Sequence, residues 1–323
     1  MNRFPSEANA MSEVLTETGN PVEQTRVNTG WRGKLRAFYH SSEAFQGYTL
    51  LSPTLLVMLF SMCVPFALMV LMSFWTQVGY EFDMAFTLKN YDKVFGEPVY
   101  SKLLLRSLWI SASCTFATVI ISYPMAYYVA FHVHRRKMIW IILMTLPFWT
   151  SYLLRIFTWK VILGFNGAIN SGLIGMGLID KPLEFLLYNP SAVVITLTHA
   201  WAAFAILPIY VSLEKIDRSL LEAATDLGDG PVARFLRVTL PLSLPGVIAA
   251  TVLIFVPTVG DYVTPALVGG PDGLMLANLI QAHFGIINNW PGGAALAIVM
   301  MGVVGIITML YIWMTRLVVR NIE

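Results

Sequence analysis

The stretch LEAATDLGDGPVARFLRVTLPLSLPG (residues 221–246) is charged and contains two turn signals, and a long apolar run follows it at once. Ser219 and Glu222 have the spacing of a capping box, in which side chains satisfy the free N–H groups that begin a helix. Gly228 predicts the end of that helix, because glycine adopts the left-handed conformation after a last turn at little cost. The first half of the stretch therefore predicts one short, capped helix.

The second half of the stretch predicts another short helix. Pro231 suits a first helical turn, and Pro241 is expected to end the helix because proline lacks an N–H group. The apolar residues expected on one face are Leu220, Ala224 and Leu227 in the first helix and Phe235 and Leu236 in the second. These residues alone fit an amphipathic loop at a membrane surface, with Glu222 only capping its own helix, as well as they fit a docking element.

The composition of the whole chain is that of a membrane protein. The chain has 323 residues, of which 56% are hydrophobic and 12% are charged, and its mean hydropathy is +0.66. Soluble domains contain about 25% charged residues, so this balance is typical of a chain that crosses a membrane several times. The net charge of +2 gives no support for nucleic-acid binding. Cys63 and Cys114 lie inside apolar runs and are expected to be small buried residues, so neither a metal nor another cofactor is predicted.

Apolar stretches of sufficient length recur along the chain, since a membrane-spanning helix needs about 20 residues. The six candidates are Tyr48–Phe74, Leu103–Phe131, Met138–Thr158, Ser191–Leu213, Leu244–Val268 and Ala294–Met314. Pro257, Gly260 and Pro265 interrupt the fifth stretch. The sequence thus predicts an all-α polytopic membrane protein with about six spans.

The basic residues orient these spans, because Lys and Arg are retained on the cytoplasmic side. They gather in the polar tail (residues 1–45), in HVHRRK (residues 132–137), around the loop (residues 215–241) and at the C-terminus. Both termini and the loop are therefore predicted to be cytoplasmic, with a disordered tail followed by a membrane domain over residues 46–323. In an outer segment, LIGMGLI (residues 173–179) has the periodicity of a helix that lies on the membrane surface.

The loop resembles the EAA signature of the membrane subunits of binding-protein-dependent ABC importers. The matching residues are Glu222, Ala223, Ala224 and Gly228, followed by Leu240 and Pro241 at the end of the loop. The resemblance implies a type I ABC importer permease fold, in which this loop is a coupling helix that fits a cleft on a cytoplasmic ATPase subunit. A rigid loop joined to the fifth span would carry movement of the ATPase into the membrane.

Beyond the loop, the chain resembles the first permease subunit of spermidine/putrescine importers. The stretches that carry this likeness are LPFWTSYLLRIFTW (146–159), SLLEAATDLG (219–228), the run from Pro257 through VGDYVTPALVGGPDG (259–273) and NNWPGGAA (288–295). Permeases for sulfate, iron, other amines or amino-acid-like compounds share parts of this pattern.

The resemblance also implies partners. The sequence lacks a GxxxxGK[ST] phosphate-binding loop, so ATP would be hydrolysed by a separate ATP-binding subunit, present as a dimer. A second permease subunit and an external substrate-binding protein are implied as well. This chain would then be a lipid-embedded pathway in a bacterial inner membrane, and not an enzyme.

Two other classes of protein fit the residues less well. An ion-coupled secondary transporter typically has inverted repeats and several intramembrane acids. An intramembrane enzyme needs a nucleophile with its base, or a pair of metal ligands. Neither pattern is found in the apolar stretches of this sequence.

A polyamine site should pair carboxylates with aromatic faces, because the ligand is a flexible apolar chain with ammonium groups. Asp261 is the best candidate, since it lies where the fifth span is interrupted and an ionisable group at membrane depth requires water, a partner or a ligand. Tyr262 would add a ring face or a hydroxyl. The alternative is that Asp261 is solvated at the outer interface or paired with Arg155.

The third span supplies the remaining candidates for the substrate path. Phe148, Trp149 and Tyr152 lie near its middle, although aromatic stripes more often serve helix packing or an interfacial belt. Trp159 fits such a belt. Arg155 is a poor ligand for a cation, and it is expected either to reach outward to the interface or to hold a carboxylate in place.

Overall fold

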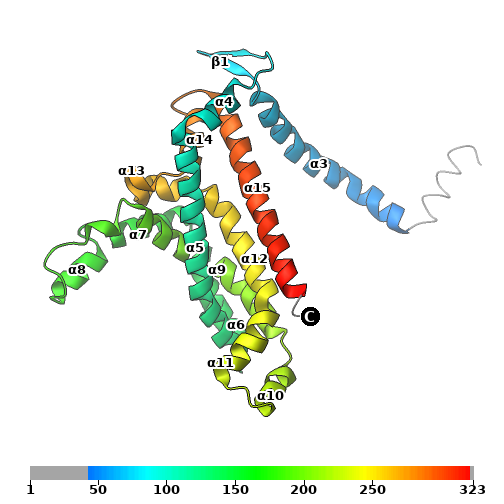
Figure 1. Ribbon diagram of the computed structural model, residues 1–323, viewed down its shortest axis with the longest axis vertical. Helices are drawn as coiled ribbons and strands as arrows, with labels where there is room; N and C mark the ends of the chain where they lie inside the picture. Colours follow the sequence, from blue (N-terminus) through cyan, green and yellow to red (C-terminus); the bar gives the residue numbers. More distant parts are fainter. Residues whose placement is uncertain (1–42, 321–323) are drawn as a thin grey trace, which may run out of the picture. The chain divides into compact units, whose positions relative to one another are not determined.

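The computed structural model describes residues 43–320, whose helices and strands are labelled in Figure 1. The tail predicted over residues 1–45 lies almost entirely outside the described residues. The chain divides into two units, residues 1–64 and residues 65–323, and each is described by itself.

Helix α3 (Glu43–Met72) carries the first predicted span. Its apolar stretch is Gly47–Met72, and no residue in the most apolar window of that stretch is buried within the chain. Cys63 on α3 is exposed, which corrects the expectation of a buried residue, whereas Cys114 on α5 (Pro98–Phe131) is buried as expected. A helix with this apolar composition requires lipid or a partner protein around it.

Five helices of the described residues are long and apolar enough to cross a membrane, and a bent pair of helices raises this number to the six that were predicted. The five are α3, α5, α9 (Pro190–Glu214), the continuous helix Pro231–Val259 and α15 (Trp290–Arg320). The bent pair corresponds to the third predicted span, which is therefore not one straight helix. Its two arms, Lys137–Trp149 and Tyr152–Gly175, meet at an angle of 84°.

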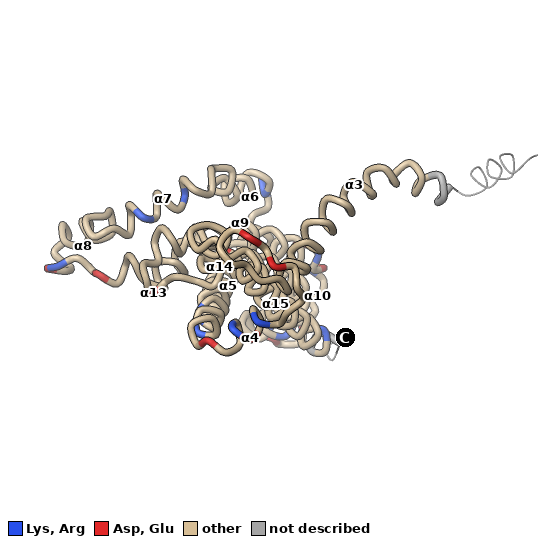
Figure 2. Tube along the Cα trace, turned by 90° about the horizontal axis from the view of Figure 1, so that it is seen from above, with Lys and Arg blue, Asp and Glu red and all other residues tan. Residues whose placement is uncertain are grey.

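The bend in the third span follows from its local sequence. The first arm contains α6 (Lys137–Thr145) and the 3-10 turn η1 (Leu146–Trp149), and the second contains α7 (Tyr152–Leu163) and α8 (Ala168–Gly175). Pro147 lacks the N–H group that would continue α6, and Thr150 and Ser151 are extended between the two arms. Figure 2 shows basic positions along α7 and charged positions in the segment that follows α8, whereas α8 itself carries no charged residue. The 3-10 turn η2 (Glu184–Leu186) then leads to α9.

The fifth span differs from the prediction at both ends. It is built from α11 (Pro231–Arg234), the π-helical turn η3 (Phe235–Thr239) and α12 (Leu240–Val259), which form one continuous helix. The prediction that Pro241 ends the loop's second helix is therefore wrong. The wide turn η3 directly precedes Pro241 and relieves the clash between a proline ring and the carbonyl group one turn earlier.

At its outer end, the fifth helix stops before Gly260 and does not continue to Val268. The elements that follow are the π-helical turn η4 (Pro265–Gly269), α13 (Gly270–Gly273) and α14 (Leu276–Phe284). The predicted interruption by proline and glycine is thus present, but it ends the span and leaves Asp261 just beyond the helix.

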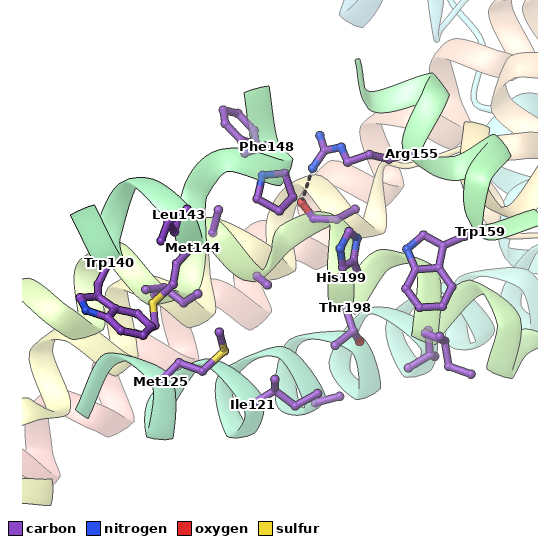
Figure 3. A pocket seen from close by; sticks show the side chains of 18 residues that line it. Ile121, Met125, Trp140, Leu143, Met144, Phe148, Arg155, Trp159, Thr198 and His199 are labelled. Carbon is purple, nitrogen blue, oxygen red and sulfur yellow. Dashed lines mark hydrogen bonds between the residues drawn. The ribbon is translucent and has the colours of Figure 1, made fainter. Parts of the chain in front are cut away.

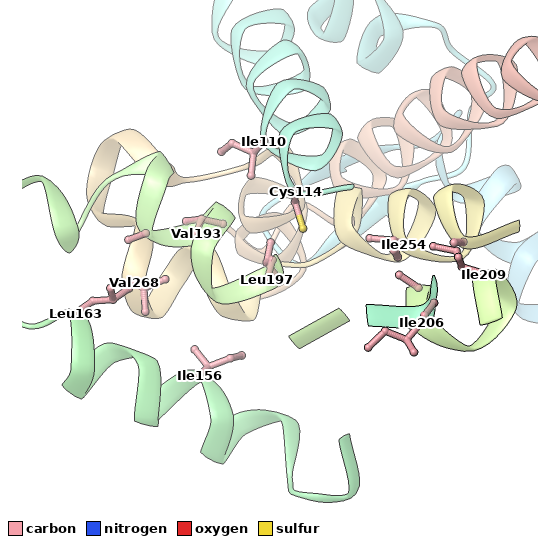
Figure 4. Close-up of a cluster of buried hydrophobic side chains, with 14 of the residues drawn as sticks. Ile110, Cys114, Ile156, Leu163, Val193, Leu197, Ile206, Ile209, Ile254 and Val268 are labelled. Carbon is pink, nitrogen blue, oxygen red and sulfur yellow. The ribbon is translucent and has the colours of Figure 1, made fainter. Parts of the chain in front are cut away.

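The main core lies where α5, α9 and α12 pack together. Figure 4 shows side chains of this core, among them Ile110, Leu197 and Ile254. Small residues allow helices in a membrane to approach closely. Gly246 of α12 lies so close to α9 that a Cβ atom would come within 2.5 Å of the Pro208 carbonyl oxygen. This core fixes the position of α12 between the loop and Asp261.

A second buried cluster joins the elements at the end opposite to the loop. It contains Val94 of α4 (Lys89–Gly96), Leu276 of α14, and Ala295 and Leu296 of α15. A two-stranded antiparallel hairpin of β1 (Thr76–Val78) and β2 (Glu81–Asp83) precedes α4. These elements form the outer end of the second unit.

Candidate functional site

Helix α10 (Arg218–Asp226) forms the first half of the loop, and Asp217 caps its N-terminus. The Asp217 Oδ1 atom accepts a hydrogen bond of 3.0 Å from the backbone N–H group of Ser219. This bond and a further one from the Ser219 side chain hold the pKa of Asp217 below its ordinary value. The predicted capping box is therefore wrong, because Ser219 lies inside the helix and Glu222 is not its third residue.

Gly228 ends α10, as predicted. Its φ of +90° lies in the left-handed region. The N–H groups of Gly228 and Asp229 donate to the carbonyl oxygens of Thr225 and Ala224, at 2.9 and 3.0 Å. This is the hydrogen-bond pattern of a Schellman motif, and it fixes the direction in which the chain continues to α11.

The loop presents exposed apolar side chains beside its signature residues. Ala224 is buried, whereas Glu222 and Ala223 are exposed. The exposed apolar residues are Leu220, Leu227, Val232 and Leu236. Leu227 is 88% exposed, so the expectation that it packs on the same face as Ala224 is wrong. Large apolar side chains left exposed on one short loop are a feature of protein interfaces.

The second half of the loop is fastened to the spans. Phe235, a predicted anchor, packs edge-on against Tyr123 and Tyr127 of α5, with ring centroids 5.7 and 5.9 Å away. Arg237 forms an ion pair of 2.8 Å with Asp229, just after α10. Since Phe235 and Arg237 belong to the same continuous helix as α12, the second half of the loop and the fifth span are one helix, to which the ion pair attaches the end of α10.

At the outer end of α12, Asp261 accepts four hydrogen bonds. Its Oδ2 atom accepts from the hydroxyl groups of Tyr152, at 2.5 Å, and Thr264, at 2.7 Å. Its Oδ1 atom accepts from the backbone N–H groups of Val263 and Thr264, at 2.9 and 3.3 Å. A carboxylate has about four lone-pair sites, so the chain already uses all of them. The Asp261 carboxylate thereby joins α7 to the turn that follows α12.

Arg155 is not the partner of Asp261. Its Nη1 atom donates to the Ala200 carbonyl oxygen at 3.1 Å, and its guanidinium carbon lies 5.5 and 5.8 Å from the ring centroids of Phe148 and Tyr152. The side chain is buried, and no ion pair of the described residues involves it. Arg155 therefore neither reaches outward nor holds a carboxylate, which corrects both expectations.

The other predicted path residues do not converge on Asp261. Tyr262 is 47% and Trp149 79% exposed. Phe148 packs edge-on against Phe204, with ring centroids 4.6 Å apart. Among the third-span candidates, Tyr152 is the residue that reaches the carboxylate.

Sequence reasoning missed Thr264, which donates to Asp261 from both its backbone and its side chain. A threonine three residues after an aspartate at a helix start is the signal that would have identified it. Within the described residues, no group of three or more His, Cys, Asp or Glu side chains is placed to hold a metal ion.

The chain is similar to known transport proteins along most of its length. The family described as "Binding-protein-dependent transport system inner membrane component" matches residues 49–323. The spermidine/putrescine transport system permease protein PotB of Escherichia coli (strain K12) is 37% identical over 240 residues, which cover 74% of this chain and 86% of that protein. PotB of Haemophilus influenzae is 36% identical over 267 residues, covering 82% and 93% of the two chains.

A solved structure has a similar fold. It is the crystal structure of a bacterial alginate ABC transporter in complex with an alginate pentasaccharide-bound periplasmic protein. One of its chains matches with a TM-score of 0.70 at 15% sequence identity, over 90% of this chain and 98% of that chain.

Proposed function

Because this chain belongs to the family of binding-protein-dependent transport system inner membrane components, we propose that it is the polyamine permease subunit of an ATP-driven importer. It is a multi-pass protein of the bacterial inner membrane and a transport component, not an enzyme. The all-α permease fold predicted from the sequence is confirmed. The observation that carries the substrate class is the 37% identity to a spermidine/putrescine permease over 74% of the chain.

The proposed assembly contains more than this chain. Residues 46–323 would be the permease domain, behind a cytoplasmic tail of residues 1–45. An ATPase dimer on the cytoplasmic side, a second permease subunit beside this one and an external binding protein would complete the importer. The family description supports the dependence on a binding protein.

The loop is the proposed contact with the ATPase subunit. Glu222 and Ala223 are exposed on α10, and Ala224 on its buried side holds the helix against the chain. Gly228 sets the angle between α10 and the continuous helix, which passes through Pro241 without a break. A displacement of α10 would therefore move the whole fifth span.

Asp261 and Tyr152 are the proposed contact with the transported amine. Because the carboxylate has no free acceptor site, an ammonium group must replace one of its donors. The Tyr152 hydroxyl is the donor to replace, since it belongs to a different helix from the carboxylate and can withdraw with it. The exposed ring of Tyr262, next to Asp261 in the sequence, would then offer a face to the alkyl chain, whereas Phe148 lies beside the Arg155 cation and is left out of this contact.

Uptake of labelled putrescine and spermidine, with the chain deleted from its host and then restored, tests this function. We expect uptake to be lost and recovered, and to require ATP. Unchanged uptake in a host with no redundant system would contradict the polyamine assignment and indicate another solute as the cargo.

Restoration with Glu222→Lys tests the coupling role of the loop. Uptake should stay absent although the subunit is inserted at a normal level, because a cation replaces an exposed carboxylate in the proposed interface. Asp92→Lys makes the same charge change on α4, far from the loop, and should restore uptake. Normal uptake with Glu222→Lys would show that the loop is not the coupling element.

A further inference from the structure

A cavity of about 690 Å³ lies between α5, α6, α7 and α9, and neither Asp261 nor Tyr152 lines it. Figure 3 shows that its two ends differ in character. Apolar side chains at one end include those of Met125, Trp140, Leu143 and Met144. The other end is lined by Arg155, Trp159, Thr198 and His199. The cavity is therefore amphipathic along its length.

The polar end of the cavity carries a buried charge without a counter-charge. Arg155 is 9% exposed, and no acid of the described residues pairs with it. Its Nε atom has no hydrogen-bond partner among the described residues. Burying a cation in a membrane is costly unless an anion or several acceptors face it. One carbonyl oxygen and two ring faces leave this demand partly unmet, so the site fits an anion.

The bend of the third span sets the depth of the two ends. The Tyr152–Asp261 hydrogen bond holds the start of the second arm at the outer end of the fifth helix, and the first arm runs from there, across the bend of 84°, toward Lys137 and the cytoplasmic side. Arg155 lies in the first turn of that second arm, whereas Trp140 lies in the first turn of α6. The charged end is therefore close to the outer headgroup region, and the apolar end is inside the bilayer.

We propose that this cavity binds one phospholipid of the outer leaflet, with its phosphate at Arg155 and one acyl chain along the apolar end. The planar guanidinium group matches the oxygens of a phosphate. His199, whose ring lies 5.4 Å from that of Trp159, stands exposed at the same end and adds a second donor. The volume of about 690 Å³ suits part of a lipid, and Ile121 and Leu143 are exposed, so the second acyl chain remains in the bilayer.

The transported amine is excluded as the occupant, because Arg155 repels a cation. That exclusion alone rests on the proposed function. The unpaired charge, the free Nε donor and the apolar length are properties of the described part of this chain, whatever it transports.

Native mass spectrometry of the purified importer, stripped of lipid and then given phosphatidylglycerol, tests the proposal. The wild type should retain one lipid per copy of this chain. Arg155→Gln should lower that retention about tenfold, as expected when a hydrogen-bonded charge pair of about 1.4 kcal/mol or more is lost. Lys160→Gln removes the same charge from the same helix, outside the lined cavity, and should retain the lipid. Diacylglycerol, which lacks the phosphate, should not be retained by any variant.

A second variant shows whether a loss of lipid in Arg155→Gln could be due to misfolding alone. Ala117→Leu adds bulk to the apolar lining on α5 and leaves Arg155 in place, and it should lower lipid retention as well. Equal retention by the wild type and both variants would overturn the proposal. A cross-link from Leu143→Cys to another subunit in the lipid-free complex would also overturn it, because a protein would then cover the cavity. A changed KM for putrescine in Arg155→Gln without loss of lipid would do the same, because the cavity would then serve the cargo. Because retention is measured without cargo, failure of the polyamine assignment would not affect this result.

Discussion

The two ends of the continuous helix Pro231–Val259 are completed in different ways. At the cytoplasmic end, the chain leaves apolar side chains uncovered, with Leu227 88% and Val232 71% exposed. At the outer end, all acceptor sites of Asp261 are filled by donors from the same chain. The comparison teaches that the outer end is held closed by internal bonds, whereas the cytoplasmic end requires another protein. Variants in the middle and at each end of this helix should separate the internal bonding of the outer end from the need for a partner at the cytoplasmic end.

The largest effect is expected from Gly246→Val, which breaks both ends together. A Cβ atom at Gly246 would lie 2.5 Å from the Pro208 carbonyl oxygen and from Ser212 Cβ, so α12 could not remain packed on α9. Such overpacking should cost about 3 kcal/mol or more and greatly reduce both the inserted subunit and uptake. Immunoblots of membranes and thermal unfolding of the purified importer measure this. Gly305→Val in α15, where a Cβ atom meets nothing within 4 Å, is the control and should change little. A normal level of Gly246→Val would contradict the close α9–α12 packing.

A smaller effect, confined to the cytoplasmic end, is expected from Gly228→Val. The left-handed conformation at φ +90° costs a β-branched residue about 1–2 kcal/mol, whereas asparagine adopts it readily. No atom lies within 4 Å of a Cβ at this position, so backbone conformation alone decides the result. Uptake by Gly228→Val should fall by about tenfold at a normal membrane level, and Gly228→Asn should transport close to the wild-type rate. Equal uptake by the two variants would mean that the angle of α10 is unimportant.

The sequence predicts the cytoplasmic end better than the outer end, because the signals at the loop are local. Gly228 marks its turn through its own conformational freedom. Pro241 was misread because the proline rule assumes regular α-helical bonding, and the π-helical turn before it removes the clash. Periodicity also concealed the bend at Thr150, since an apolar run of sufficient length looks the same whether straight or broken.

The hydrogen bond between Asp261 and Tyr152 could not be predicted from local sequence, because the two residues are 109 positions apart. An ionisable residue at an interrupted span indicates that a partner exists, but nothing local names that partner. Thr264 carries a local signal, whereas Tyr152 and the isolation of Arg155 become apparent only when α7 is folded against α9 and η4.

Uptake by Tyr152→Phe and by Asp261→Asn, measured side by side, tests whether the hydrogen bond between these two residues breaks when a ligand binds. Removing the Tyr152 hydroxyl deletes one hydrogen bond to a charged group, worth about 1.5–3 kcal/mol, and leaves the carboxylate one free acceptor site. Uptake by Tyr152→Phe should stay within a few-fold of wild type, because an ammonium group fills that site. Asp261→Asn should lower uptake about tenfold or more, because the charge that attracts the amine is lost. If both variants lose uptake equally at normal membrane levels, the pair only fastens α7 to the fifth span.

The smallest effect concerns pH and should be confined to the outer end. His283 of α14 is buried, its Nδ1 atom has no partner among the described residues, and burial lowers its pKa below the ordinary value. The folded state therefore disfavours the protonated imidazole, so the stability that the neutral ring provides is complete above about pH 6.5 and is lost as pH falls through the lower folded pKa. Hydrogen exchange, corrected for intrinsic rates, should become faster in α14 between pH 7 and pH 5 and unchanged in α10, and His283→Leu should remove the pH dependence in α14. An equal response in α10 would mean that the two ends of the fifth helix are not independent, because loosening the outer packing would then reach the loop.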